Sequence, residues 1–106
     1  MRYQCLAGLA GLAILWGGQP VLADDPDPDR GLDLALRWCS SCHVIGPSFG
    51  GGDAGPSFES VAKRPGQTAI NLRSWLAEPH GPMPDFQLSA DQYDDLVAHI
   101  LSLQEQ

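Results

Sequence analysis

The chain of 106 residues is expected to fold as a small all-α protein with three to four short helices. Three observations predict this class. Apolar residues recur at helical spacing in several segments, capping residues precede these segments, and no segment shows the alternating pattern of a strand. Glycine and proline, 12 and 9 of the residues, separate the segments. The helices should therefore be short and joined by loops.

Four segments combine a capping residue with an apolar face. The last is the best defined, because Ser89 and Gln92 have the spacing of a capping box. The glycine-rich stretch 44–55 is expected to be a loop without regular structure. The four helices are expected at 28–39 after Asp27, at 57–62 ending before Pro65, at 68–78 ending before Pro79, and at 89–103.

The N-terminal 23 residues resemble a secretory signal peptide. Arg2 gives a short positive region, residues 6–16 are apolar or glycine, and Val21-Leu22-Ala23 offers small or aliphatic residues before a cut. The apolar run is shorter than the roughly 20 residues of a spanning helix, so cleavage is favoured over an uncleaved anchor. We expect residues 1–23 to be removed, 24–30 to form a mobile acidic arm, and 31–106 to form one domain.

The size and charge of the mature chain limit its possible functions. Removing 23 of 106 residues leaves 83, which at most suffice for one small domain. The formal charge of −7 becomes −8 when Arg2 is lost, which argues against nucleic acid or an anionic membrane as partner. Removal of Cys5 leaves Cys39 and Cys42 as the only cysteines.

Cys39-Ser40-Ser41-Cys42-His43 carries the most specific chemistry. This C-x-x-C-H pattern is typical of covalent c-type haem attachment. Thiols three residues apart lie on one face of a helical turn, where each can add to one vinyl group of the same porphyrin. His43 then lies beneath the ring as proximal iron ligand. A large apolar cofactor would also supply the core that 83 residues lack, so we expect the apoprotein to be largely unfolded.

Three other interpretations of this motif compete with haem attachment. A thioredoxin-like redox pair would follow a strand, whereas the residues before Cys39 have a helical pattern. A zinc site requires four ligands, and adjacent Cys42 and His43 are poorly placed to share one ion. A plain disulfide remains open. The haem interpretation is the strongest of the four.

Met83 is the leading candidate for the second axial ligand. It is the only methionine left after Met1, and Pro82 and Pro84 restrict the backbone on either side of it. His80, in the same loop, is the alternative, and His99 is more consistent with a structural role. Ligation by both His43 and Met83 would close the iron to substrates, which favours electron transfer over catalysis.

The proximal histidine is expected to donate its second ring nitrogen to a fixed acceptor. The carbonyl of Pro56, which follows Gly55, is the first choice. The carbonyl of Pro47 is the alternative.

These residues together resemble the class I cytochromes c, especially the small bacterial periplasmic ones. The similarity covers most of the mature chain. Gly55-Pro56-Ser57-Phe58 resembles the segment whose proline carbonyl binds the proximal imidazole, and Trp75 to Pro79 resembles the stretch that places an aromatic near the haem. Met83-Pro84 resembles the methionine loop. The cofactor-binding set implied is Cys39, Cys42, His43, Pro56, Trp75 and Met83, with His43 and Met83 on the metal.

The resemblance implies a cytochrome c fold, with the N- and C-terminal helices crossing and one haem c bound through Cys39 and Cys42. It also implies one-electron transfer between periplasmic redox proteins by a monomer, without enzymatic activity or stable membrane insertion. A haem subunit of a larger periplasmic oxidoreductase is the alternative, followed by a haem enzyme or sensor with an open distal site.

The chain departs from the family pattern in two places. Ala35 and His99 stand where aromatics are usual, so the helix crossing should be loose or filled by Trp38 and Tyr93. The lysine-rich docking face that is typical of the family is also missing, because Lys63 is the only lysine. Docking is therefore expected through an apolar rim around the haem edge, with Lys63, Arg64 and Arg73 as a local basic patch.

Overall fold

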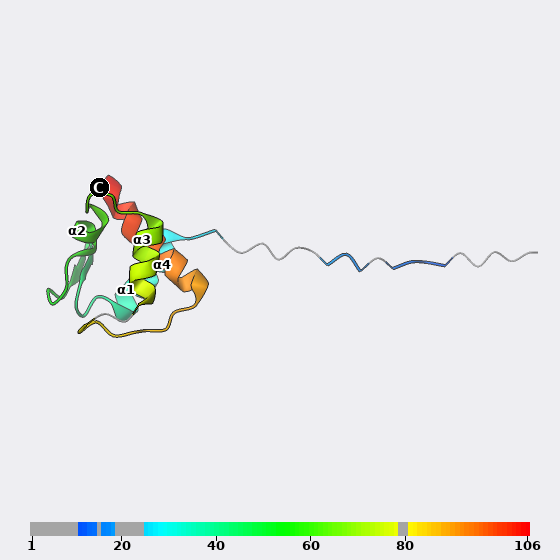
Figure 1. The fold of residues 1–106 in the computed structure, drawn as a ribbon, viewed down its shortest axis with the longest axis horizontal. Coiled ribbons are helices and arrows are strands. Elements are labelled where there is room, and N and C mark those ends of the chain that lie inside the picture. Colours follow the sequence, from blue (N-terminus) through cyan, green and yellow to red (C-terminus); the bar gives the residue numbers. More distant parts are fainter. Residues whose placement is uncertain (1–10, 15, 19–24, 79–80) are drawn as a thin grey trace, which may run out of the picture.

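The computed structural model describes residues 11–14, 16–18, 25–78 and 81–106. Within these ranges the chain forms four α-helices, a final 3₁₀ helix and a two-stranded sheet (Figure 1). All four expected helices are present, so the prediction of a mainly helical fold is confirmed. The elements are α1 Pro28–Trp38, β1 Val44–Gly46, β2 Phe49–Gly51, α2 Phe58–Ala62, α3 Ala69–Ala77, α4 Ala90–Ser102 and η1 Leu103–Glu105.

The expected signal peptide lies mostly outside the described residues, as do Cys5 and the cleavage site at 21–23. Residues 11–14 and 16–18 are described; they are exposed and belong to no helix or strand. Across the described ranges, no helix has both the length and the apolar character needed to cross a membrane.

Each helix begins at the expected N-cap. Because the first N–H groups of a helix lack partners within it, a side-chain oxygen at the cap stabilises the start. Ser89 and Gln92 form the complete capping box that the sequence predicted. The other three caps are Asp27 accepting from Asp29 N–H, Ser57 from Ser60 N–H, and Thr68 from Asn71 N–H.

The small sheet corrects the prediction of an all-α chain. β1 and β2 pair antiparallel, with Val44 opposite Gly51 and Gly46 opposite Phe49. The stretch was expected to lack regular structure because it is rich in glycine. Here glycine permits the pairing instead, since a Cβ at Gly51 would collide with the carbonyl of His43.

α1 and α4 pack against each other through small residues of α1. Ala35 is fully buried, and Gly31 lies so close to α4 that a Cβ there would meet the carbonyl of Asp95. His99 is also buried and its Nε2 lies 2.7 Å from the Ile45 carbonyl, which connects α4 to β1. The crossing is therefore close.

The two aromatics expected at this crossing line a small gap together with Leu34 of α1 and Leu96 of α4, and each ring also contacts another residue. Trp38 stacks on Phe86, which lies in the loop between α3 and α4. The Arg73 guanidinium lies over the Tyr93 ring, with its Cζ 4.9 Å from the ring centroid. The close part of the contact between α1 and α4 is formed by the small residues Gly31 and Ala35 and by the hydrogen-bonded His99.

An ion pair also joins α1 to α4. The Arg30 Nε donates to the Asp95 carboxylate at 2.9 Å, and the Asp27 N–H donates to the same carboxylate at 2.8 Å. The Arg30 hydrogen bond holds the pKa of Asp95 below its usual range, against the opposing effect of burial, and the Asp27 N–H adds to the lowering. Asp95 is therefore ionised at neutral pH.

The core lies beneath the helix crossing and along one side of α2 and α3. The described residues also include three buried polar side chains, those of His43, Asp95 and His99. The buried members of the core are Ala35, Cys39, Ile45, Phe58, Ala62, Leu72, Leu96, Val97, Ile100 and Leu103.

Candidate functional site

The C-x-x-C-H motif lies in the turn that follows α1. Cys39 is the C-cap, and the N–H groups of Cys42 and His43 both donate to its carbonyl, at 3.2 and 2.9 Å. This continuing turn holds the two thiols close together. Cys39 is buried, Cys42 is exposed, and both are free thiols.

Cys39 does not have the properties of a reactive thiolate. Burial raises the pKa of its thiol to about 11, and the neighbouring Cys42 thiol adds to this effect. Redox-active and metal-binding cysteines have lowered pKa values instead. In the described part of the chain, no group of three or more His, Cys, Asp or Glu side chains gathers to hold a metal ion. These observations support neither the thioredoxin-like nor the zinc interpretation.

His43 is buried and its ring orientation is fixed by two neighbours. Its Nδ1 lies 2.6 Å from the carbonyl of Pro56, and its ring centroid lies 5.2 Å from that of Phe58. Because a carbonyl can only accept, Nδ1 is the donor of this hydrogen bond, and the neutral imidazole then has its lone pair at Nε2. The acceptor in the structure is thus the carbonyl of Pro56 and not that of Pro47.

Gly55 is part of this arrangement. A Cβ at position 55 would meet three atoms of the His43 ring, at 2.8 Å from Nδ1 and 2.9 Å from Nε2. The absence of a side chain therefore allows the backbone before Pro56 to lie against the imidazole.

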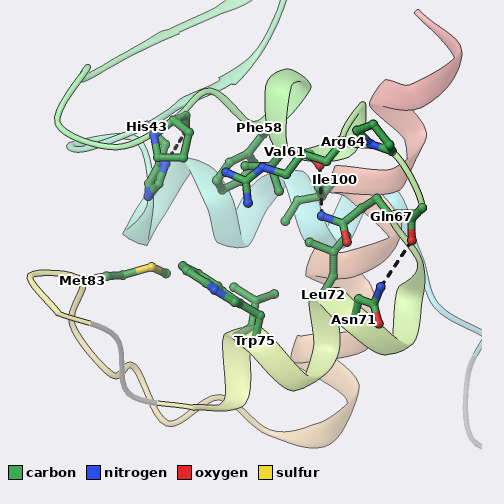
Figure 2. Close-up of a pocket in the computed structure, with 14 residues that line it drawn as sticks. His43, Phe58, Val61, Arg64, Gln67, Asn71, Leu72, Trp75, Met83 and Ile100 are labelled. Carbon is green, nitrogen blue, oxygen red and sulfur yellow. Dashed lines mark hydrogen bonds between the residues drawn. The ribbon is translucent and has the colours of Figure 1, made fainter.

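Met83 and Trp75 lie across the cavity from His43 (Figure 2). Trp75 comes from α3, and Met83 from the proline-rich loop that follows this helix. Pro79 and His80, in the same loop, lie outside the described residues, so the structure does not place the alternative ligand His80. His99 is engaged with the Ile45 carbonyl and does not line this cavity.

Two adjoining cavities bring the six predicted site residues together. The larger has a volume of about 480 Å³ and the smaller about 270 Å³. His43, Pro56, Trp75 and Met83 line both, and Cys39 and Cys42 line the smaller one. The six residues come from four separate parts of the chain and lie around one crevice.

The walls of the larger cavity are mostly apolar. Phe58, Leu72 and Ile100 are buried there, and Val61 and Leu76 are half-buried. Haem c is a flat and largely apolar group. It requires apolar walls, two thiols at its edge, and axial ligands such as a histidine and a thioether on opposite sides. The residues present therefore fit this cofactor.

Three polar residues of the cavity were not identified from the sequence. Arg64, Gln67 and Asn71 line it at the end away from Met83 (Figure 2). Gln67 and Asn71 donate to the carbonyls of Val61 and Gly66, at 3.0 and 3.3 Å, which holds their side chains near the turn between α2 and α3. No local motif marks these residues, because their common position depends on the packing of α2 and α3.

Two of the three residues expected to form a basic patch are paired with acidic side chains. Lys63 Nζ lies 2.6 Å from the Glu59 carboxylate, and Arg73 Nε lies 3.3 Å from that of Asp94. Arg64 lines the larger cavity, whereas Arg73 lies in a groove between α3 and α4.

Comparison with known proteins identifies a close relative. The chain is 46% identical over 79 residues to a protein named Cytochrome c-552 of Bradyrhizobium diazoefficiens, a match that covers 73% of this chain and 75% of that protein. No protein-family model matches the chain, and no solved structure matches it. The similarity shows that the chain belongs to the class I c-type cytochromes, with one covalently bound haem c and a role in electron transfer.

Proposed function

We propose that the chain is a periplasmic electron carrier whose haem is attached through Cys39 and Cys42 and whose iron is held by His43 and Met83. One observation carries the proposal: all six residues expected at the site line two adjoining cavities. The bound haem would supply one-electron exchange between Fe(III) and Fe(II).

The residues around the cavity have distinct roles in this proposal. The Pro56 carbonyl, 2.6 Å from His43 Nδ1, fixes the orientation of the ring, in which Nε2 would bind the iron. Met83 completes the coordination from the opposite wall, which leaves no open position for a substrate. This arrangement favours an electron carrier over an enzyme.

The polar end of the cavity is suited to the haem carboxylates. Arg64 supplies a permanent positive charge, and the amides of Gln67 and Asn71 lie beside it on the same wall. A charge-assisted hydrogen bond from a guanidinium is among the stronger contacts available to a carboxylate. We assign these three residues to that role.

Location and partners follow from the N-terminal segment and the surface. The pattern of residues 1–23 predicts export, which fits attachment of haem c outside the cytoplasm. Trp38, Trp75 and Phe86 line the smaller cavity and are 36–46% exposed. We propose that periplasmic electron donors and acceptors dock on this apolar rim, and that the protein is a monomer.

The test is the optical spectrum of the oxidised holoprotein, which shows a weak far-red band when a methionine sulfur binds the iron. The native protein and a His80→Ala variant should both show the band. Met83→Ala should lose it, should have a lower midpoint potential, and should bind carbon monoxide rapidly when reduced. A band that persists in Met83→Ala would exclude Met83 as the ligand. A band that is lost in His80→Ala but kept in Met83→Ala would also contradict ligation by Met83.

A further inference from the structure

Trp38 and Phe86 form a stacked aromatic pair on the surface beside the smaller cavity. Their ring centroids lie 5.9 Å apart, and the ring planes differ by 9°. This distance and angle are those of an offset-stacked pair, a favoured geometry for aromatic side chains. Both rings are only partly buried, with 36% and 38% of their surface exposed. The pair is therefore not simply part of the core.

The pair joins two segments that both belong to the site. Trp38 is the last residue of α1 and directly precedes Cys39, whereas Phe86 lies three residues after Met83. Both rings line the smaller cavity together with Met83, and both also line a small gap of about 20 Å³ with Met83 and Pro84. The end of α1 and the loop that carries Met83 therefore face the same gap.

The loop around Met83 has a defined local shape. Pro82 and Pro84 restrict the backbone on both sides of the methionine. The Asp85 carboxylate accepts from Gln87 N–H at 3.0 Å, and Gln87 has a left-handed backbone conformation with φ of 50°. These features stiffen the loop internally, whereas the Trp38–Phe86 contact fixes its position relative to α1.

We propose that the Trp38–Phe86 stack clamps the methionine loop to the end of α1 and sets how often Met83 leaves the iron. This inference rests on the proposed role of Met83 as ligand. Trp38 and Phe86 act through Met83 and are positioning residues. Opening of the loop requires the rings to separate, so the stacking energy adds to the free energy of opening.

The half-exposed position makes the pair suitable for substitution. Replacing a half-exposed ring by leucine retains much of the apolar contact and removes the stacking. The test compares Trp38→Leu, Phe86→Leu and the double variant with native holoprotein. Phe86→Tyr keeps a ring at the same place and serves as the conservative variant. Phe49→Leu is the matched control, because Phe49 is also 38% exposed but lies in β2.

Two measurements distinguish a clamp from a general effect on stability. The first is the dissociation constant of imidazole for the oxidised protein, since imidazole binds only when Met83 has left the iron. The second is the temperature at which the far-red band disappears, compared with the temperature at which helical circular dichroism is lost. Loss of a clamp should lower the temperature at which the far-red band disappears more than the temperature at which helix is lost.

Each leucine variant should bind imidazole about threefold to tenfold more tightly, in line with the strength of an aromatic pair. The far-red band of each should disappear at a lower temperature, further below the loss of helix than in the native protein. The double variant should bind imidazole less tightly than the product of the two single effects predicts, because both substitutions remove the same contact. Phe86→Tyr and Phe49→Leu should behave as the native protein.

Unchanged imidazole affinity in Phe86→Leu would overturn the clamp, and so would independent effects in the double variant. If Trp38→Leu gives no holoprotein, Phe86→Leu against Phe86→Tyr carries the test alone. A native protein without the far-red band would instead refute the proposed Met83 ligation. Failure of the clamp and failure of the proposed ligand are therefore separate results.

Discussion

At the scale of single residues, the orientation of His43 depends on a glycine. The backbone of Gly55 lies against the imidazole so closely that a Cβ would meet ring atoms of His43. The ring cannot turn away without losing its hydrogen bond to the Pro56 carbonyl. A methyl group at position 55 would therefore displace either the loop or the ligand.

We predict that Gly55→Ala destabilises the holoprotein by about 1–3 kcal/mol, the usual range for overpacking. Chemical unfolding of the native and variant holoproteins measures this difference, and the yield of covalent haem shows whether the site still matures. Gly50→Ala is the control, because a Cβ there would meet nothing within 4 Å. Equal stability of the Gly55→Ala and native proteins would contradict the close approach.

The residues of the site differ in how far the sequence identifies them. Cys39, Cys42 and His43 form a motif with few other uses, and Met83 stands out as a lone methionine between prolines. Arg64, Gln67 and Asn71 are ordinary polar residues, and nothing in their spacing marks them. They share a cavity only because α2 and α3 both contact α4 and the residues from the turn between them to the first turn of α3 face the cavity. Their shared position at the cavity depends on tertiary packing, which no local sequence pattern indicates.

At the scale of elements, the helices were predictable and the sheet was not. Each helix has a capping side chain and an apolar face, which are local signals. The strands Val44–Gly46 and Phe49–Gly51 have three residues each, too few to show an alternating pattern. Their glycines suggested a loop, yet one of them, Gly51, permits the close backbone pairing beside His43.

The contact between α1 and α4 depends on Gly31. Alanine is a better helix former than glycine by about 1 kcal/mol, but a Cβ at this position would meet the Asp95 carbonyl of α4. Since the obstacle is backbone, we predict that Gly31→Ala lowers the free energy of unfolding by about 1–3 kcal/mol. Denaturant titration of the holoprotein measures the change. Asp33→Ala, at an exposed position of α1, should not destabilise the protein, and a Gly31→Ala protein as stable as Asp33→Ala would refute the close crossing.

The ion pair between the same helices should make stability depend on pH. The pKa of Asp95 is lowered by the hydrogen bond from Arg30, so the folded state binds this proton more weakly than the unfolded state, where the pKa is about 3.9. The resulting stabilisation is present above about pH 4 and is lost as the pH falls through the lower folded pKa.

Asp95→Asn removes the charge and keeps an acceptor for the Asp27 N–H. We predict a loss of about 1–2 kcal/mol at pH 7, a modest value because the Arg30 side chain is 48% exposed. Unfolding measured from pH 7 down to pH 3 should show the native and variant curves converge at the acid end. A difference between them that stays constant with pH would show that the charge of Asp95 is not responsible.

At the scale of the whole molecule, the apolar cavities should couple folding to the cofactor. The larger measures about 480 Å³ and is lined mainly by apolar side chains. Without the cofactor these side chains would face water, which weakens the core of a chain this small. The cofactor of a class I cytochrome fills such a space with apolar contacts, so folding and haem binding should be strongly coupled.

We therefore predict that a chain of residues 24–106 carrying Cys39→Ala and Cys42→Ala, made without haem, is largely unfolded. Its far-UV circular dichroism should show little helix and no cooperative thermal transition, whereas the holoprotein should show both. Adding free haem should restore part of the helical signal, since His43 and Met83 remain available and the apolar walls are unchanged. The same variant carrying Met83→Ala should recover less. A haem-free chain with native helix content that unfolds cooperatively would contradict this prediction. It would show that the helices, including α1 and α4, form a sufficient core without haem. The crevice would then be a preformed cavity rather than a consequence of haem binding.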